Sequence, residues 1–381
     1  MLVGMHRRFF LMGAAAQAAR AQYAPRRKYR AVIIGDTGHG NYGHGWDLAW
    51  SSIPEVEVAA VADPNDAGRA KAQERCRAKK AYRDYREMIA REKPDIVTIC
   101  PRWCDQRLDM VKAATDAGAH ILVEKPIART LVEADQIVAM AEARGVKVQV
   151  GHTARVMAVT ALVRNMVEAG ELGTLLEIRG RGKEDKRAGG EDLIVLGTHV
   201  FDLMRHYAGD PQWVFAHATE SGREVTRSMM REASEPVGQV GGDQIAAMFL
   251  FGNGVHGYFG SKGSEVSTGR RFGLTLAGSR GWVFVPLNDV PGAPPYVMRS
   301  PAWVPEKGES WERVNYPADR AVPSRGGTNH LMAIDLIEAI EKDRPPACSA
   351  RDGRWTIEMV AGIYQSQMNV AKVDFPLRTR P

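Results

Sequence analysis

The feature that most constrains the fold is a short apolar run that leads directly into a cluster of glycines. Residues 31–34 read Ala-Val-Ile-Ile, and glycines follow at Gly35, Gly38, Gly40, Gly43 and Gly45. An unbroken, β-branched run predicts a strand buried on both faces of a parallel sheet. Glycines at its end allow a sharp turn and a close approach of the backbone to a ligand. The combination predicts the dinucleotide-binding edge of a Rossmann-type sheet.

The glycine spacing departs from the G-x-G-x-x-G pattern at one position. Gly35 and Gly40 fit the first and third glycines, whereas Thr37 occupies the second and Gly38 is expected to serve in its place. In this pattern a pyrophosphate is bound by free N–H groups where the next helix begins. We therefore expect a helix soon after Gly40.

Asp63 follows a second β-rich run, residues 56–61, and comes 23 positions after Gly40. An acidic side chain at the tip of the second strand accepts hydrogen bonds from a ribose diol and repels a 2′-phosphate. The sequence therefore favours NAD, with NADP as the poorer cofactor, although Arg69 lies nearby. The alternative for Asp63 is a turn or helix-capping role, because Asp-Pro-Asn-Asp is also a good turn sequence.

Strand and helix patterns alternate up to residue 150. Helices are predicted at 70–79, 85–91, 107–118 and 131–145, and further strands at 95–100, 120–123 and 146–150. This regular alternation predicts an α/β domain, a doubly wound parallel sheet of Rossmann type, over residues 28–150.

Residues 151–381 show a different pattern, in which strands follow one another. Strands are predicted at 175–179, 212–219, 244–251, 255–261, 272–277 and 282–286, and helices at 156–168, 331–341 and 355–367. Asn253-Gly254 between two of the strands is a hairpin signal. We expect an α+β substrate-binding domain with a large, open, mostly antiparallel sheet.

Two motifs together give a family resemblance. The first motif is Glu124-Lys125-Pro126, which directly follows the predicted strand at 120–123. The second is the Gly-x-His-x-x-Asp segment of residues 197–202, with Gly197, His199 and Asp202. With the glycine segment, they resemble the Gfo/Idh/MocA family of sugar and cyclitol oxidoreductases, over roughly residues 30–377. The resemblance implies a homodimer or homotetramer assembled through the C-terminal sheet.

The resemblance also implies a set of site residues. The cofactor would contact Gly35, Thr37, Gly38, Gly40, Asp63, Pro101, Trp103, Glu124 and Lys125, and the substrate Lys125, Arg155, Lys183, Asp192, His199 and Asp202. Lys125 would supply the cation and His199 the proton acceptor. Val195 stands where the family has an aspartate, and we expect Asp192, or Glu191, to approach the same pocket.

Three functions are compatible with these residues. The first is an NAD(P)-dependent oxidoreductase that acts on a carbinol of a sugar, sugar derivative or cyclitol by hydride transfer. The second is a redox-neutral glycoside hydrolase that keeps its NAD through oxidation, elimination, hydration and reduction. The third is a non-catalytic sugar-binding or scaffold protein, because a fold alone does not fix function.

Composition bears mainly on which partners and ligands the protein could bind. Seven basic residues near the N-terminus account for the formal net charge of +6, namely Arg7, Arg8, Arg20, Arg26, Arg27, Lys28 and Arg30. The remainder is close to neutral, so a nucleic-acid partner is not expected. Four cysteines in 381 residues do not indicate a disulfide framework, and no metal site is expected.

The N-terminal segment has the pattern of an export signal. Arg7-Arg8 precedes Phe9-Phe10-Leu11 and an alanine-rich run, which predicts a twin-arginine signal over residues 1–24. The apolar stretch is too short to span a bilayer. We expect a periplasmic or exported enzyme, with a cytoplasmic protein as the alternative.

Overall fold

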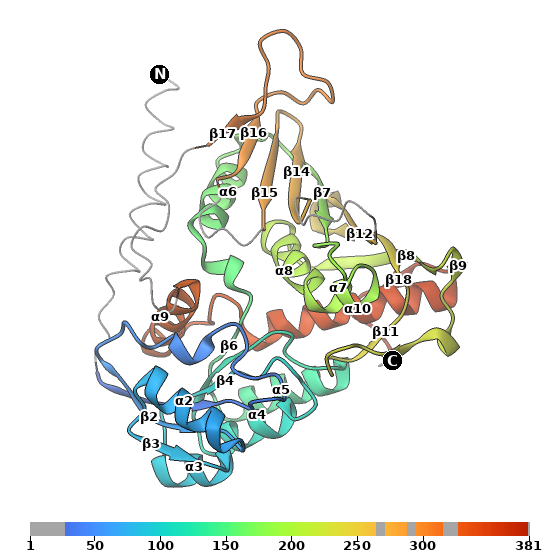
Figure 1. Cartoon of the computed structure of the whole chain (residues 1–381). Helices are drawn as coiled ribbons and strands as arrows, with labels where there is room; N and C mark the ends of the chain where they lie inside the picture. The colour runs from blue at the N-terminus through green and yellow to red at the C-terminus, as the bar shows by residue number, and fades with distance from the viewer. Residues whose placement is uncertain (1–26, 264–270, 288–293, 315–326, 380–381) are drawn as a thin grey trace, which may run out of the picture.

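The computed structural model describes residues 27–263, 271–287, 294–314 and 327–379. The predicted signal, residues 1–24, lies outside these described residues. Two sheets lie at opposite ends of the molecule, and the long helix α10 (Ala350–Asn369) crosses between them (Figure 1). None of the described helices is long and apolar enough to cross a membrane.

The first sheet has six parallel strands in the order β3-β2-β1-β4-β5-β6. Its strands are β1 (Tyr29–Ile34), β2 (Val56–Ala62), β3 (Lys80–Tyr82), β4 (Ile96–Ile99), β5 (His120–Val123) and β6 (Val148–Val150). The helices between them are α2 (Asp66–Cys76), α3 (Tyr85–Glu92), α4 (Arg107–Asp116) and α5 (Leu131–Ala143). The predicted Rossmann sheet is confirmed. The strand order reverses between β1 and β4, where such sheets bind their ligands.

The connection after β1 differs from the expected strand–turn–helix unit. Turns lead only to a short 3-10 helix, η1 (Trp46–Leu48), before β2 begins. The cause is a run of positive φ angles at Gly38, Gly40, Gly43 and Gly45, which no right-handed helix contains. Buried Trp46 then anchors the end of the segment. The expectation of a helix that meets a pyrophosphate soon after Gly40 was wrong.

The second sheet is mostly antiparallel, as predicted. Its main order is β17-β16-β15-β14-β7-β13-β12-β8-β18, with β9 paired to β8, and the β7–β13 pair is parallel. The strands are β7 (Leu175–Arg181), β8 (Pro211–Glu220), β9 (Arg223–Glu224), β12 (Gln244–Phe251), β13 (His256–Lys262), β14 (Gly273–Gly278), β15 (Trp282–Pro286), β16 (Tyr296–Met298), β17 (Glu312–Arg313) and β18 (Val373–Asp374). Asn253 has a φ of 59° at the predicted hairpin turn. A separate pair, β10 (Arg231–Glu232) and β11 (Gln239–Val240), lies beside α7.

Helices join the two sheets. The second half contains η2 (Thr153–Val156), α6 (Ala158–Glu168), α7 (Gly190–Val195), α8 (Gly197–Ala208), η3 (Arg227–Met229), η4 (Gly252–Gly254) and α9 (Gly327–Glu341). Helix α10 contacts α5 on one side and β8 and α8 on the other (Figure 1). Helix α8 packs closely on β7, where a Cβ at Gly180 would come within 2.3 Å of Val200. These contacts place the start of α8 opposite the end of β5.

Candidate active site

Lys125 marks the centre of the site. It follows β5 at the carboxyl edge of the first sheet, where ligands of such sheets bind, and only 5% of its surface is exposed. Its Nζ atom donates a hydrogen bond to the carbonyl oxygen of Val195, at 3.0 Å. Burial lowers the pKa of Lys125, although Glu124 and Glu235 oppose this change.

A cavity of about 390 Å³ opens around Lys125. Its polar lining comes from both halves of the chain: His44, Glu124, Lys125, Thr153, Lys183, Arg187, His199, Thr328 and Asn329. Trp46, Met157, Leu196, Phe272 and Leu287 supply apolar surface. Apolar walls with a few convergent polar groups are typical of small-molecule sites. The structure thus brings Lys125, Lys183 and His199 together, as predicted.

His199 lies near the start of α8 and lines this cavity. Its ring makes no hydrogen bond within the described part of the chain, and it meets the ring of His152 edge to face, with centroids 5.1 Å apart. Burial lowers the pKa of His199 well below its usual value, and Lys125, His152 and His44 lower it further. The ring is therefore a neutral imidazole around pH 7, consistent with the absence of a carboxylate at Val195.

Asp192 does not replace the missing aspartate. Its buried carboxylate accepts hydrogen bonds from Lys183 N at 3.1 Å, Glu184 N at 3.0 Å and Ser261 Oγ at 2.6 Å, and it does not line the cavity. Glu191 accepts from Arg231 and Ser234 instead. The expectation that either carboxylate approaches the pocket was wrong, because Asp192 holds the loop that carries Lys183.

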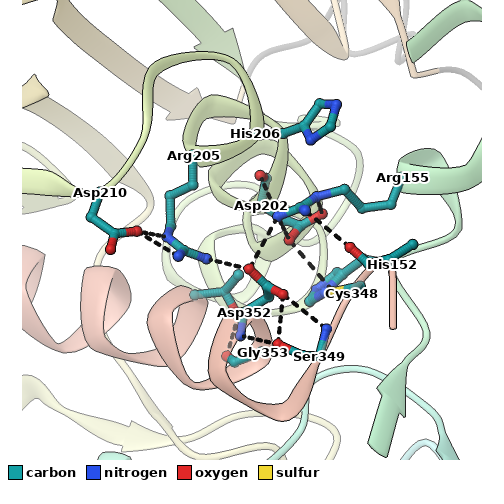
Figure 2. A network of polar contacts seen from close by, with 12 residues as sticks. His152, Arg155, Asp202, Arg205, His206, Asp210, Cys348, Ser349, Asp352 and Gly353 are labelled. Atoms are coloured by element: carbon teal, nitrogen blue, oxygen red, sulfur yellow. Dashed lines mark hydrogen bonds and ion pairs between the residues drawn. The ribbon is translucent and has the colours of Figure 1, made fainter. Parts of the chain in front are cut away.

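Arg155 and Asp202 form an ion pair behind the cavity rather than in it. Arg155 Nε and Nη2 donate to the two carboxylate oxygens of Asp202 at 2.8 and 2.7 Å, and Asp352 lies 3.5 Å away (Figure 2). This network ties η2 and α8 to the first turn of α10. Neither residue lines the cavity, so the structure corrects their assignment as substrate ligands.

The same network brings three possible metal ligands together. The ligand atoms of His152, Asp202 and Cys348 lie within 4.8 Å of one another (Figure 2). Arg155 already bonds both carboxylate oxygens of Asp202, and the Cys348 thiol makes a contact of 3.5 Å to one of them. Burial raises the pKa of Cys348, which disfavours the thiolate that a metal needs. The cluster therefore serves packing rather than metal binding.

Asp63 is fully engaged by protein donors. Its buried carboxylate accepts hydrogen bonds from Thr37 Oγ1 at 2.7 Å, Tyr42 Oη at 2.8 Å and Asn65 N at 2.9 Å, as well as from Thr37 N. Asn65 in turn caps α2. A ribose diol would have to compete with these donors, so the ribose role of Asp63 stays a prediction beside the turn role now observed.

The glycine segment contacts the loop after β4. A Cβ at Gly40 would lie 2.6 Å from Trp103 N and 3.2 Å from Pro101 C, and Arg102 N donates to Gly40 O at 3.1 Å. In contrast, a Cβ at Gly38 would meet nothing within 4 Å. The open backbone at Gly38 leaves room for a dinucleotide along this segment, whereas Gly43, five residues later, packs close to Glu124.

His44 is a cavity residue that the sequence reading missed. Its Nδ1 atom contacts Glu124 Oε1, and its carbonyl accepts from Asn329 Nδ2 at 3.0 Å. Glu124 Oε2 accepts from Lys125 N at 2.6 Å. Burial alone would raise the pKa of Glu124, but His44, Lys125 and Arg107 lower it to about 2. The signal available in the sequence was a histidine between two glycines, in the segment expected to face the ligand.

This arrangement is that of the two-domain nicotinamide-dependent oxidoreductases, with a Rossmann sheet below the cavity and a second sheet domain above it. The chain belongs to the Gfo/Idh/MocA family. The family's model for its NAD-binding Rossmann fold matches residues 29–152, and its C-terminal domain model matches residues 160–284. The two matches together span more than half of the chain. The first half is therefore the family's NAD-binding domain.

Curated relatives are similar to parts of the chain. It is 26% identical to levoglucosan dehydrogenase of Pseudarthrobacter phenanthrenivorans over 59% of this chain and 65% of that protein. It is 27% identical to D-apiose dehydrogenase of Paraburkholderia graminis over 51% of this chain and 54% of that protein. The chain thus aligns with less than two thirds of either relative.

Solved structures extend the likeness to the whole fold. Levoglucosan dehydrogenase in complex with NADH and levoglucosan superposes with a TM-score of 0.74, covering 92% of this chain and 100% of that one, at 20% identity. An NAD-binding oxidoreductase from Klebsiella pneumoniae superposes with a TM-score of 0.71, covering 91% of this chain and 99% of that one, also at 20% identity. At such identity the likeness shows a common fold.

Proposed function

We propose that this protein is an NAD-dependent oxidoreductase that oxidises a carbinol of a sugar, sugar derivative or cyclitol. One observation carries the proposal. The buried amine of Lys125 lies at the carboxyl edge of β5, in a cavity that it shares with two imidazoles. Relatives named as dehydrogenases of levoglucosan and D-apiose support the substrate class.

Oxidation of a carbinol needs a hydride acceptor, a base for the hydroxyl proton and a cation for the developing alkoxide. Bound NAD supplies the hydride acceptor. Gly38, Glu124 and Lys125 are the residues that would hold it at this edge. Lys125 would also donate a hydrogen bond to the reacting oxygen, and its buried position makes that interaction stronger than it is in water.

The cavity suits a small polyhydroxylated molecule. Its volume of about 390 Å³ is at the small end of the range for ligand pockets. Asn329, Thr328 and Thr153 offer neutral hydrogen-bonding groups along the lining, while Trp46 and Phe272 offer flat apolar faces. A sugar ring presents both kinds of surface, with hydroxyls at its rim and C–H groups on its faces.

The test is oxidation of a defined panel. Levoglucosan, D-apiose, D-xylose and myo-inositol are each incubated with the full chain and NAD or NADP, and formation of reduced cofactor is followed by absorbance. We expect NAD-dependent oxidation of at least one compound, slowed by about 100-fold or more in K125M. Reduced cofactor from none of them, together with cleavage of nitrophenyl glycosides by a protein that retains NAD, would establish the redox-neutral hydrolase instead.

Export by the twin-arginine route and assembly through the C-terminal sheet remain part of this proposal. An enzyme that folds around its cofactor before export suits this route, because the route carries folded proteins. Fractionation of cells that express the full chain and an R7K/R8K variant tests export. Size-exclusion chromatography with light scattering tests assembly.

A further inference from the structure

The two imidazoles of the cavity lie in opposite electrostatic surroundings. His44 contacts the buried carboxylate of Glu124 through Nδ1. His199 has Lys125, His152 and His44 as its charged or polar neighbours, and no described carboxylate bonds its ring. A proton taken up by His199 would therefore place a cation beside Lys125. A proton taken up by His44 would form an ion pair with Glu124.

We infer that His44, held by Glu124, is the group that accepts the proton of the reacting hydroxyl, and that His199 is not. The inference rests on the proposed function and deepens it. A carboxylate that orients an imidazole and stabilises its protonated form is a recurring device of acid–base catalysis. In this chain a carboxylate–imidazole pair joins the glycine segment to the residue after β5, whereas no described carboxylate bonds the ring of His199 in α8.

The backbone around His44 is built to present this side chain. Gly43 has a φ of 58°, and a Cβ there would lie 2.4 Å from Cys100 O and 3.0 Å from Glu124 Oε1. A larger residue would thus push the segment away from Glu124. On the far side, Asn329 Nδ2 binds the His44 carbonyl at 3.0 Å.

The free edge of the ring faces the ligand space. Since Nδ1 contacts Glu124, Nε2 is the remaining nitrogen, and 56% of the His44 side chain is exposed. His44 lines both the main cavity and a smaller one of about 30 Å³ beside it, each of which also contains Lys125 and Arg187. The ring therefore reaches the same space as the Lys125 amine.

The step balances with a nicotinamide dinucleotide as the oxidant. The hydroxyl O–H bond breaks and its proton goes to Nε2 of His44, whose positive charge is matched by Glu124. The C–H bond breaks with its electron pair, which the oxidised dinucleotide accepts as hydride, and the carbon–oxygen double bond forms. Lys125 hydrogen-bonds that oxygen throughout. In the reverse direction His44 returns the proton.

The kinetic test compares H44Q with H199Q and uses H217Q as the matched control. His217 also pairs with a glutamate, Glu224, at 2.9 Å, but on the exposed surface. We expect H44Q to lower kcat by about 100-fold or more, to keep NADH affinity and to remove the acidic limb of the kcat/KM profile. H217Q should match the wild type. A larger loss in H199Q than in H44Q, or an acidic limb retained in H44Q, overturns the inference.

A labelling test gives a readout that does not depend on turnover. Diethyl pyrocarbonate modifies accessible imidazoles, and mass spectrometry locates the label. We expect bound NADH to slow labelling of His44 and to leave His217 unchanged, and we expect E124Q to alter labelling of His44 only. Labelling of His44 that is indifferent to NADH overturns the inference. If no polyol is oxidised while NADH protects His44, the proposed substrate class fails but His44 still faces the dinucleotide.

Discussion

The ammonium of Lys125 donates its hydrogen bond to the backbone carbonyl of Val195, at 3.0 Å. By resemblance, this is the position at which the family has an aspartate. The backbone carbonyl offers Lys125 a neutral dipole, and the apolar Val195 side chain adds no negative charge beside it. The cation of Lys125 is held in place, but its charge is not neutralised from that side, and burial lowers its pKa.

Restoring a carboxylate at Val195 should change the pH dependence of catalysis. In V195D the new charge favours protonated Lys125, which raises the pKa of its amine. Lys125 must be charged to stabilise the alkoxide, so activity is lost as pH rises through that pKa. We expect the alkaline limb of kcat/KM to move up by about one pH unit. V195N, whose side chain has the shape of aspartate without its charge, should leave the alkaline limb where it is. An equal shift in V195N would mean that charge is not the cause.

Removing the amine of Lys125 should affect chemistry more than cofactor binding. K125M keeps the length of the buried chain but loses the donor to the reacting oxygen. Loss of one such donor costs about 100-fold to 1,000-fold in kcat. NADH affinity, measured by fluorescence titration, should fall by much less than kcat, because Gly38 and Glu124 remain to hold the cofactor. A K125M enzyme with wild-type kcat and a raised KM would show that Lys125 only binds substrate.

Replacing Asp63 should lower the stability of the fold. D63N replaces an acceptor of several hydrogen bonds by an amide that cannot accept them all, and a buried unpaired donor costs about 1–3 kcal/mol. Y42F removes one hydrogen bond and should cost less. Urea unfolding measures both. A D63N protein that is fully stable but binds NADH more weakly would instead show that Asp63 serves the ribose.

Buried histidines should make the protein sensitive to mild acid. Burial, aided by Arg155, lowers the pKa of His206 to about 4, against 6.5 for an unperturbed histidine. Between about pH 7 and pH 5 the unfolded chain takes up this proton and the folded chain does not. The free energy of unfolding therefore falls, by about 2 kcal/mol for one such residue.

The variant H206N tests this linkage. It should reduce the drop in unfolding free energy between the two pH values by about 2 kcal/mol. His152, whose pKa burial lowers to about 4, continues to contribute in the variant. If the unfolding free energy of H206N fell between pH 7 and pH 5 as much as that of the wild type, His206 would not be the source of the acid sensitivity.

The sequence predicted the strands better than it predicted the site. Buried parallel strands are continuous apolar runs, so residues 31–34 and 120–123 could be recognised from composition alone. The missing helix after β1 could not, because positive φ at four glycines is a property of the backbone in place. The motifs did indicate that Lys125 and His199 lie in one cavity, while their roles there stay predictions.

The remaining site residues could not be predicted because the sequence does not show which way a side chain points. Asp192 lies one turn before Val195 in α7, but its carboxylate accepts hydrogen bonds from the backbone N–H groups of Lys183 and Glu184 and from Ser261. Spacing along the helix could not reveal these partners. His44 escaped notice because its partner, Glu124, is 80 positions away and meets it only in the folded chain.

The most direct test of the central claim is calorimetric titration of the purified full chain with NADH, after any retained nucleotide has been assayed and removed. We predict one NADH bound per chain, with tighter binding than for NADPH, and binding retained in K125M. A chain that is folded, as shown by a cooperative unfolding transition, but binds neither dinucleotide would contradict the account and leave a sugar-binding or scaffold protein on this fold.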